Sequence, residues 1–207
     1  MSFRISSKRK KYRSKSHKSR KLPLAIVLLI VIVIVIMAFY MFSLNDSSSP
    51  NTPKGDKVLL QTSMGYITIQ LRDDRPITTN NFKNLVQQGV YDGTIFHRVI
   101  ADFMIQGGDP TGTGFGDPSI PIIKDELHGD NQNNRGTISM ANTGQPNSGS
   151  SQFFINVLNN NNLDTKHSVF GNVTSGMDVV DEISKVSTDS NDRPLIEVTL
   201  IKAEIIS

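Results

Sequence analysis

An arginine inside an apolar run is the first feature of this chain whose residue type and setting could support chemistry. The run extends from Thr94 to Ile100, and Arg98 is the only residue in it with a permanent charge. Because side chains alternate along a strand, Phe96, Arg98 and Ile100 would share one face. An arginine beside large apolar side chains either covers them with its aliphatic stem or directs its five N–H donors at a bound group. The run alone leaves both interpretations open.

Other patterns associated with catalysis are missing from the sequence. Residues 107–116 contain five glycines, but they lack the Lys-Ser/Thr pair of a phosphate-binding P-loop, and no helical pattern follows them. The serines at 148, 150 and 151 lie in no nucleophile elbow. The chain has no cysteine, and its four histidines show no metal-ligand spacing: His17, His97, His128 and His167. We therefore expect no hydrolase chemistry and no metal.

Short strands and few helices must position the candidate residues. Apolar alternation and turn signals predict a hairpin, 58–62 and 66–71 around Gly65. Further along the chain, Met104 and Gln106 would point to the same face of a strand just before the turn Gly107-Gly108-Asp109. Only two helices are predicted, 76–88 and 176–186, while the remaining strands are expected at 94–100, 136–142, 152–157, 168–173 and 195–206. This pattern favours a mainly β domain that forms a closed antiparallel barrel.

The N-terminal quarter of the chain differs in composition from the rest. The net charge is +3, yet residues 1–21 hold ten Lys or Arg and no acid, which leaves twelve basic against nineteen acidic residues beyond, or −7. Residues 22–42 carry no charge and match the roughly 20 residues that cross a hydrocarbon core as a helix. We expect a disordered basic tail, 1–21, a transmembrane signal-anchor helix, 22–42, a flexible linker, 43–56, and a folded domain, 57–207.

The charge of the tail also predicts the orientation of the chain. Cytoplasmic flanks of membrane helices are rich in Lys and Arg, so the tail would stay in the cytoplasm and the domain would lie outside the cell membrane. A cleaved signal peptide usually has an apolar region of about 7–15 residues and a small-x-small cleavage site, which residues 37–42 do not offer. A tail that binds nucleic acid is another alternative. The apolar span directly after it makes membrane orientation the simpler explanation, and we expect no nucleic-acid partner.

Four sequence blocks occur in an order that resembles one protein family. They are Phe96-His97-Arg98-Val99 with Phe103 to Asp109, then Ser139 to Asn142, then Gly149 to Ile155, then Leu163-Asp164 with Lys166-His167 and Val169-Phe170-Gly171. Over about residues 57–206 the chain resembles the cyclophilin-type peptidyl-prolyl cis/trans isomerases. The resemblance implies an eight-stranded antiparallel β-barrel capped by two α-helices. It also implies an enzyme that rotates Xaa-Pro bonds in flexible protein segments without a cofactor. The alternative is a membrane-tethered chaperone or adaptor that binds proline peptides with little turnover.

The resemblance assigns roles to individual residues. It implies catalysis by Arg98, Phe103 and Gln106, the first of which matches the family's active-site arginine. It implies substrate binding in a proline pocket and an adjoining groove by seven further residues: Met104, Ala141, Asn142, Gln152, Phe154, Leu163 and His167. His97 also matches a family block, but we interpret it as structural because neighbouring strand residues face opposite ways.

One position departs from the family pattern. Many eukaryotic members have a tryptophan directly before the Leu-Asp pair, where this chain has Asn162. The position borders the site for cyclosporin-type ligands, so we predict weak binding of those ligands with little effect on catalysis. We also expect a monomer. Asn45 and Asn172 lie in N-glycosylation patterns, which are common by chance, and the sequence leaves their use open.

Overall fold

The computed structural model describes Met37 and residues 56–206, and residues 56–206 form one β-rich domain. No helix within these described residues is long and apolar enough to cross a membrane. The predicted tail, span and linker, 1–56, lie outside them apart from Met37 and Asp56. The predictions for that part of the chain therefore stay predictions.

Nine strands of the domain form a single antiparallel sheet in the order β3-β9-β1-β2-β8-β6-β7-β5-β4. The strands are β1 (Lys57–Thr62), β2 (Gly65–Leu71), β3 (Thr94–Ile95), β4 (Arg98–Ile100), β5 (Met104–Gly107), β6 (Thr137–Met140), β7 (Phe153–Asn156), β8 (Val169–Ser175) and β9 (Thr199–Ile206). Two α-helices, α2 (Pro76–Gln87) and α3 (Met177–Ser184), and a 3₁₀ turn, η1 (Asn161–Leu163), complete the described elements.

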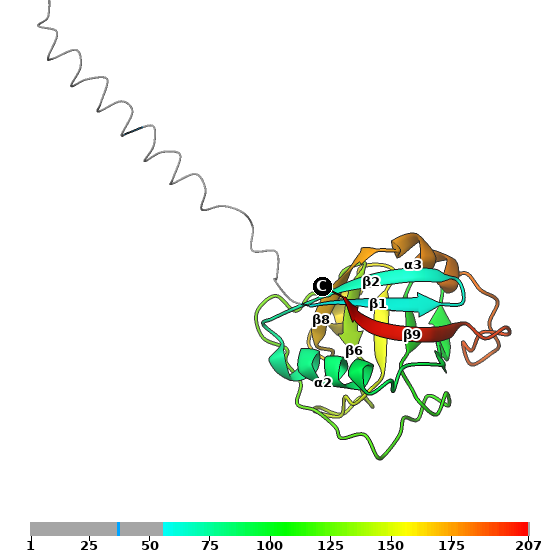
Figure 1. Ribbon diagram of the computed structural model, residues 1–207, viewed down its shortest axis with the longest axis horizontal. Helices are drawn as coiled ribbons and strands as arrows, with labels where there is room; N and C mark the ends of the chain where they lie inside the picture. The colour runs from blue at the N-terminus through cyan, green and yellow to red at the C-terminus, as the bar shows by residue number, and fades with distance from the viewer. Residues whose placement is uncertain (1–36, 38–55, 207) are drawn as a thin grey trace, which may run out of the picture. The chain divides into compact units, whose positions relative to one another are not determined.

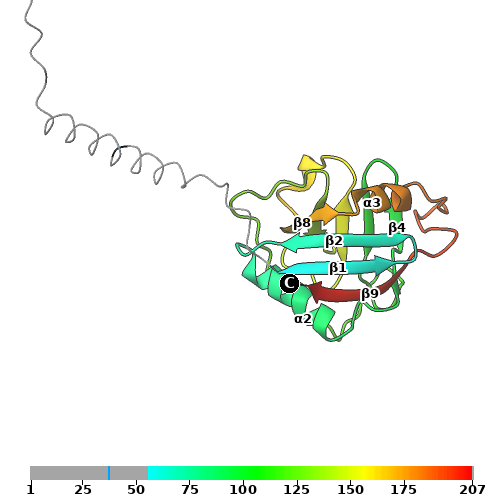
Figure 2. The ribbon, with the colours of Figure 1, turned by 45° about the horizontal axis from the view of Figure 1, so that its top comes forward.

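The two helices contribute buried residues to one core and approach it from opposite directions. Figure 1 shows β2, β1 and β9 side by side, with α3 above them and α2 below. Helix α2 packs on β9 and β8, whereas α3 packs on β2, β4 and β5. Figure 2, turned by 45°, shows the same three strands running across the domain between the helices. The predicted mainly β fold with two helices is confirmed.

Local sequence explains how the first elements form. The predicted hairpin joins β1 to β2, and Gly65 has the positive φ of 142° that the turn requires. A Cβ on Gly65 would lie 2.7 Å from a methyl carbon of Val179 in α3, so glycine also permits close packing there. Helix α2 starts at Pro76, and the buried carboxylate of Glu126 accepts the N–H groups of its first turn.

The predicted strand 94–100 is wrong, because the chain breaks it at Phe96-His97. Residues before the break, β3, pair with β9, and residues after it, β4, pair with β5. Phe96 consequently points into the main core, 1% exposed, and does not share a face with Arg98. Because of the same break, the predicted closed eight-stranded barrel is also wrong. Within the described residues the sheet has nine strands and curls without a ladder between its end strands, β3 and β4.

The predicted strand 195–206 is too long at its start. Its partners end early, since the β1 ladder stops at Thr62 opposite Leu200 and the β3 ladder stops at Ile95 opposite Thr199. Leu195 and Ile196 are therefore exposed on a loop despite their apolar side chains. The other predicted elements match the observed ones to within about two residues at each end.

Alternation along the strands produces two apolar clusters on the two faces of the sheet. Val99, Ile105 and Ile155 belong to the main core, which lies inside the curl. Their neighbours Met104 and Phe154 belong to a second, smaller cluster on the outer face. Buried apolar surface stabilises the fold by about 25 cal/mol per Å², so each face carries its own packing energy.

Candidate active site

The outer face of four adjacent strands brings the sequence blocks together in one row. Arg98 of β4 lies opposite Gln106 of β5, Gln106 lies opposite Phe154 of β7, and Phe154 lies opposite Ser139 of β6. Residues that are directly opposite in an antiparallel sheet point to the same side. The arginine, the glutamine and the phenylalanine are thus neighbours although they are up to 56 positions apart in the sequence.

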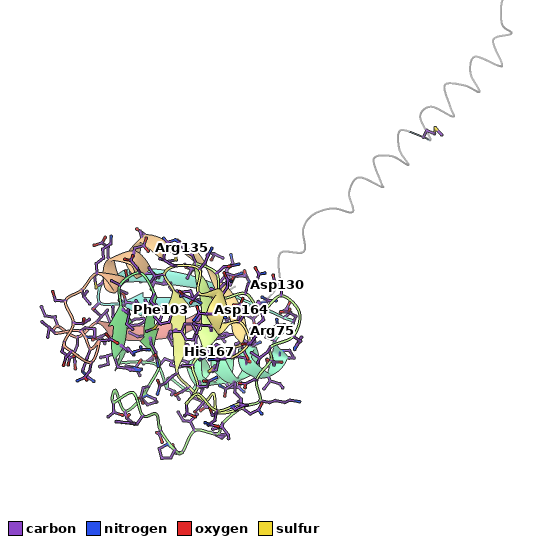
Figure 3. All side chains as sticks on the ribbon, turned by 180° about the vertical axis from the view of Figure 1, so that it is seen from behind. Arg75, Phe103, Asp130, Arg135, Asp164 and His167 are labelled. Carbon is purple, nitrogen blue, oxygen red and sulfur yellow. The ribbon has the colours of Figure 1, made fainter. Side chains whose placement is uncertain are left out.

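An apolar patch occupies the middle of this face. Met104, Phe154 and Ala141 form it, and they are 2%, 4% and 8% exposed. Three partly buried side chains pack against them: Ile100, Phe103 and Leu163. Figure 3, which shows the domain from behind, labels Phe103 and His167 on the side turned away from the viewer of Figure 1. The predicted pocket residues therefore do form one contiguous apolar surface.

Buried amide groups support this patch from one side. Asn156, which is fully buried, donates from Nδ2 to Thr137 Oγ1 at 2.8 Å and to Asn133 Oδ1 at 3.3 Å. Its Oδ1 accepts Asn160 Nδ2 at 2.7 Å, and the same Nδ2 donates to the carbonyl of Phe103 at 2.9 Å. A buried polar network with satisfied partners specifies one geometry. We call Asn133, Asn156 and Asn160 the asparagine network.

The segment from Leu163 to His167 is fixed by similar bonds. Asn131 Nδ2 donates to the carbonyls of Asp164, at 2.6 Å, and of His167, at 3.0 Å. The His167 ring lies edge-on to Phe154, with ring centroids 5.2 Å apart, and its Nδ1 is 3.0 Å from the carbonyl of Met140. Burial lowers the pKa of His167, which favours the neutral ring with Nδ1–H as the donor.

The polar end of the row is more exposed than the patch. Arg98 Nε lies 3.4 Å from Asp192 Oδ2, and both side chains are 43% exposed. The terminal nitrogens of Arg98 have no partner among the described residues. An arginine with only Nε engaged can still present its outer N–H groups to a ligand in a fixed plane.

A groove of about 460 Å³ adjoins the row, and four of the predicted residues line it: Gln106, Ala141, Asn142 and Gln152. Gln106 Nε2 donates to Gln152 Oε1 at 2.9 Å, and Gln152 Nε2 donates to the carbonyl of Gly114 at 3.0 Å. The loop that carries Gly114 is held by the buried carboxylate of Asp109. This carboxylate accepts the N–H groups of Thr111, Gly114 and Gly116.

Two buried ionisable groups lie beneath the glycine-rich loop. Burial opposes ionisation of Asp109, but the N–H groups and the hydroxyl of Thr111 outweigh it, so the pKa of Asp109 lies below its usual value. His97 is 6% exposed, and neither ring nitrogen makes a well-formed hydrogen bond to the described residues. Burial lowers the pKa of His97. Within the same residues, no group of three or more metal-ligating side chains is present.

The structure thus gathers all the sequence-predicted site residues on one face. The contributors that the sequence did not single out include Ile100, Asn160 and Asp192. Ile100 had a signal, because alternation put it on the face of Arg98. Asn160 lay in a run of asparagines that indicated only a polar loop. Asp192 had no signal, since 94 positions separate it from Arg98.

Comparison with protein families gives a match over nearly the whole domain. A family model described as "Cyclophilin type peptidyl-prolyl cis-trans isomerase/CLD" matches residues 57–205. The peptidyl-prolyl cis-trans isomerase ppi1 of Schizosaccharomyces pombe is 51% identical over 150 residues, which cover 70% of this chain and 96% of the relative. Peptidyl-prolyl cis-trans isomerase-like 1 of Mus musculus is 46% identical over 158 residues, which cover 74% of this chain and 95% of the relative.

Solved structures give the same result for the fold. The crystal structure of a cyclophilin type peptidyl-prolyl cis-trans isomerase from Cryptosporidium parvum is similar with a TM-score of 0.70 and 32% identity, and the match covers 73% of this chain and 98% of that chain. A structure of the same protein in the presence of the dipeptide Ala-Pro matches with a TM-score of 0.70 and 32% identity, over 73% of this chain and 99% of that chain.

Proposed function

This chain belongs to the cyclophilin-type peptidyl-prolyl cis-trans isomerases and is an enzyme of that class, and from this premise we propose how its residues divide the work. The reaction is rotation about the amide bond before a proline, against a resonance barrier of about 18–20 kcal/mol. No covalent bond has to break. The enzyme has to hold the proline ring, let one flank rotate and favour the twisted state in which conjugation is lost.

The apolar patch is the part of the site that we assign to the proline ring. Met104 and Phe154 are held by the sheet, and the carbonyl of Phe103 is held by Asn160. A surface that is already formed binds a small apolar ring without an ordering cost. The patch contacts the ring equally in the ground state and the twisted state, so it provides affinity more than rate acceleration.

Arg98 supplies the interaction that is specific to the twisted state. The proline nitrogen has no hydrogen, and it becomes a hydrogen-bond acceptor once its lone pair leaves conjugation. The outer N–H groups of Arg98 are free within the described residues and lie in one rigid plane. The observation that carries this proposal is the cross-strand pair Arg98–Gln106 directly beside buried Phe154.

The groove beyond Gln106 would take the peptide that flanks the proline. The side chain of Asn142 is occupied, since Nδ2 donates to Lys166 O and Oδ1 accepts Gly144 N–H. Among the described residues its main chain has no partner, so an extended peptide could pair with it as an added strand does. Gln106 and Gln152, linked to each other, would border the same peptide.

An NMR titration of the full-length chain with an Ala-Pro peptide tests this assignment. We expect the largest shifts at Gln106, Asn142 and the aromatic ring of Phe154, together with faster cis/trans exchange of the peptide. Shifts confined to the shallow hollow between Leu85 and Pro121 would contradict the assignment. Binding without faster exchange would favour the adaptor alternative for this chain.

The second part of the proposal concerns location and partners. The basic tail, 1–21, and the uncharged span, 22–42, support a monomeric domain tethered outside the cell membrane that assists folding of extracytoplasmic or membrane-proximal clients. Protease digestion of intact cells should remove the domain and spare the tail. Mass spectrometry of the membrane-extracted protein should find Met1 to Phe42 retained. A mature N-terminus between Phe39 and Ser49 would show a cleaved signal instead.

A further inference from the structure

A short loop between α3 and β9 contacts both the end strand β4 and the glycine-rich segment. Residues 189–193 close on themselves, because the Asp189 carboxylate accepts the N–H groups of Asn191, at 2.8 Å, and Arg193, at 3.0 Å. The N–H of Asp189 in turn donates to the carbonyl of Arg193 at 2.8 Å. These bonds give the loop a defined shape although it is largely exposed.

Two contacts attach this loop to the catalytic face. The N–H of Val99 donates to the carbonyl of Asp192 at 2.8 Å, so the loop occupies the open edge of the end strand β4. Arg193 Nη1 donates to the carbonyl of Gly112 at 2.7 Å, which joins the loop to the glycine-rich segment. That segment also holds Gln152 through Gly114. The loop therefore has a fixed position relative to both Arg98 and the groove.

The side chain of Asp192 is the loop's direct contact with Arg98. Its Oδ2 accepts the Nε–H of Arg98 at 3.4 Å. Its carbonyl accepts the N–H of Val99, the residue that follows Arg98. Asp192 has a φ of +63°, in the left-handed region that Asp and Asn adopt more readily than most other residues. A carboxylate in this place engages the guanidinium from its stem side and leaves the outer nitrogens free.

We propose that Asp192 is a positioning residue that fixes the plane of the Arg98 guanidinium for the substrate. This inference rests on the role proposed for Arg98 above. An arginine on the exposed edge of a sheet has several free rotamers, and holding Nε removes most of them. The bond aims the outer N–H groups at the patch without occupying them. Asp192 acts only through Arg98 and does not contact the proline itself.

A double-mutant cycle in the full-length chain tests the proposal. Asp192→Gly removes the carboxylate and tolerates the positive φ, and Asp192→Asn removes only the charge. We expect Asp192→Gly to lower kcat/KM about three- to fivefold, the range expected for a half-exposed ion pair, and Asp192→Asn to lower it less. The loss should appear in kcat and leave KM for a proline peptide nearly unchanged. In an Arg98→Ala background, Asp192→Gly should have no further effect.

One control variant, one spectroscopic measurement and one contrary result separate the possible outcomes. Asp181→Asn on α3 weakens another partly exposed ion pair, with Arg135 at 2.8 Å, and should leave kcat/KM unchanged. The NMR signal of Arg98 Nε–H should exchange faster with water in Asp192→Gly than in the wild type. An equal loss of activity with and without Arg98 would mean that Asp192 only supports the loop, and this would overturn the proposal.

Three further results would also overturn it. If Arg98→Ala is impaired but Asp192→Gly is fully active, Asp192 does not position the arginine, while the proposed function stands. If Asp192→Gly is more active than the wild type, the carboxylate competes with the substrate instead. Full activity of Arg98→Ala would remove the proposed role of Arg98 itself, and the inference with it.

Discussion

The two ends of the site are held in place by different means. At the pocket end, Met104 and Phe154 are almost completely buried, and the asparagine network behind them has hydrogen bonds as short as 2.7 Å. At the arginine end, a single 3.4 Å contact joins two half-exposed side chains. Bonds to buried groups are strong and specific, whereas exposed ion pairs contribute little to stability.

This difference matches the tasks that we propose for the two ends. A pocket that holds the proline ring gains from rigidity, because the ring has the same shape before and after rotation. A donor that acts only in the twisted state needs a set guanidinium plane and outer N–H groups that stay free for the proline nitrogen. The contact of Asp192 with Arg98 Nε leaves the outer nitrogens without a partner among the described residues, as such a donor requires.

The largest expected effect comes from removing the donor. Arg98→Ala should lower kcat/KM by roughly 10²–10³, or about 2.7–4 kcal/mol, as removal of one preorganised donor does elsewhere. Affinity for a proline peptide should change much less because the patch remains. Arg98→Lys should restore only part of the rate, since an ammonium lacks the planar fork. Exchange NMR on an Ala-Pro peptide measures the rate.

A control and a contrary outcome accompany this prediction. Lys202→Ala removes an exposed cation on β9, far along the sheet order from β4, and should leave the rate unchanged. The NMR spectra also report whether each variant is folded. If folded Arg98→Ala works within about threefold of wild type, the arginine only covers apolar surface.

The pocket end should respond through stability rather than through the rate of rotation. Asn156→Ala leaves the buried side chains of Asn133, Asn160 and Thr137 short of partners, so we expect the free energy of unfolding to fall by about 1–3 kcal/mol. Urea denaturation measures it. Asn161→Ala, at an exposed position of η1, should change stability by less than about 0.5 kcal/mol. Equal values for both variants would show that the network is not what holds the pocket.

Acid should lower the free energy of unfolding through one histidine at each end of the site. Burial lowers the pKa of both His97, near the arginine, and His167, near the pocket. As the pH falls below about 6.5, the histidines of the unfolded chain are protonated before those of the folded chain. The free energy of unfolding therefore decreases. Each group adds a slope of at most about 1.4 kcal/mol per pH unit. His97→Gln and His167→Gln should each reduce the slope in urea titrations at several pH values, and an unchanged slope would contradict the assignment for that histidine.

Local patterns predicted the parts of the site that lie within single strands. Alternation alone placed Met104 and Gln106 on one face, and the structure confirms it. The same rule failed for Phe96, because it assumes an unbroken strand. Between Ile95 and Arg98 the chain changes pairing partners, and the face of the next residue is set by tertiary contacts. This one break divides a predicted strand into β3 and β4. It therefore accounts both for the ninth strand and for the sheet not closing into a barrel.

Contacts between distant segments were not predictable in this way. The contact of Arg98 with Asp192 depends on a loop shape that arises from bonds within residues 189–193. The asparagine network joins Asn156 of β7 to Asn133 and Asn160 in the loops, and an asparagine by itself more often indicates a surface loop than a buried network. Leu195 and Ile196 look like a strand but lack a partner strand to pair with. Propensity describes single segments, whereas these features depend on which segments meet.

The smallest expected effect concerns the rim of the pocket, at Asn162, where the family resemblance led us to expect a tryptophan. Asn162 is exposed in η1 and directly precedes Leu163, whose side chain packs against the apolar patch. A tryptophan at 162 that buries roughly 50 Å² against a cyclosporin-type ligand would add about 1 kcal/mol, or about fivefold in affinity. Asn162→Trp should therefore bind cyclosporin more tightly by calorimetry, with little change in kcat/KM. Asn161→Trp is the matched control, because Asn161 is the exposed neighbour whose side chain bonds Asn134 and Asp164. Equal affinities for both variants and the wild type would mean that the 162 side chain does not border the ligand, and that the pocket end stops at Leu163.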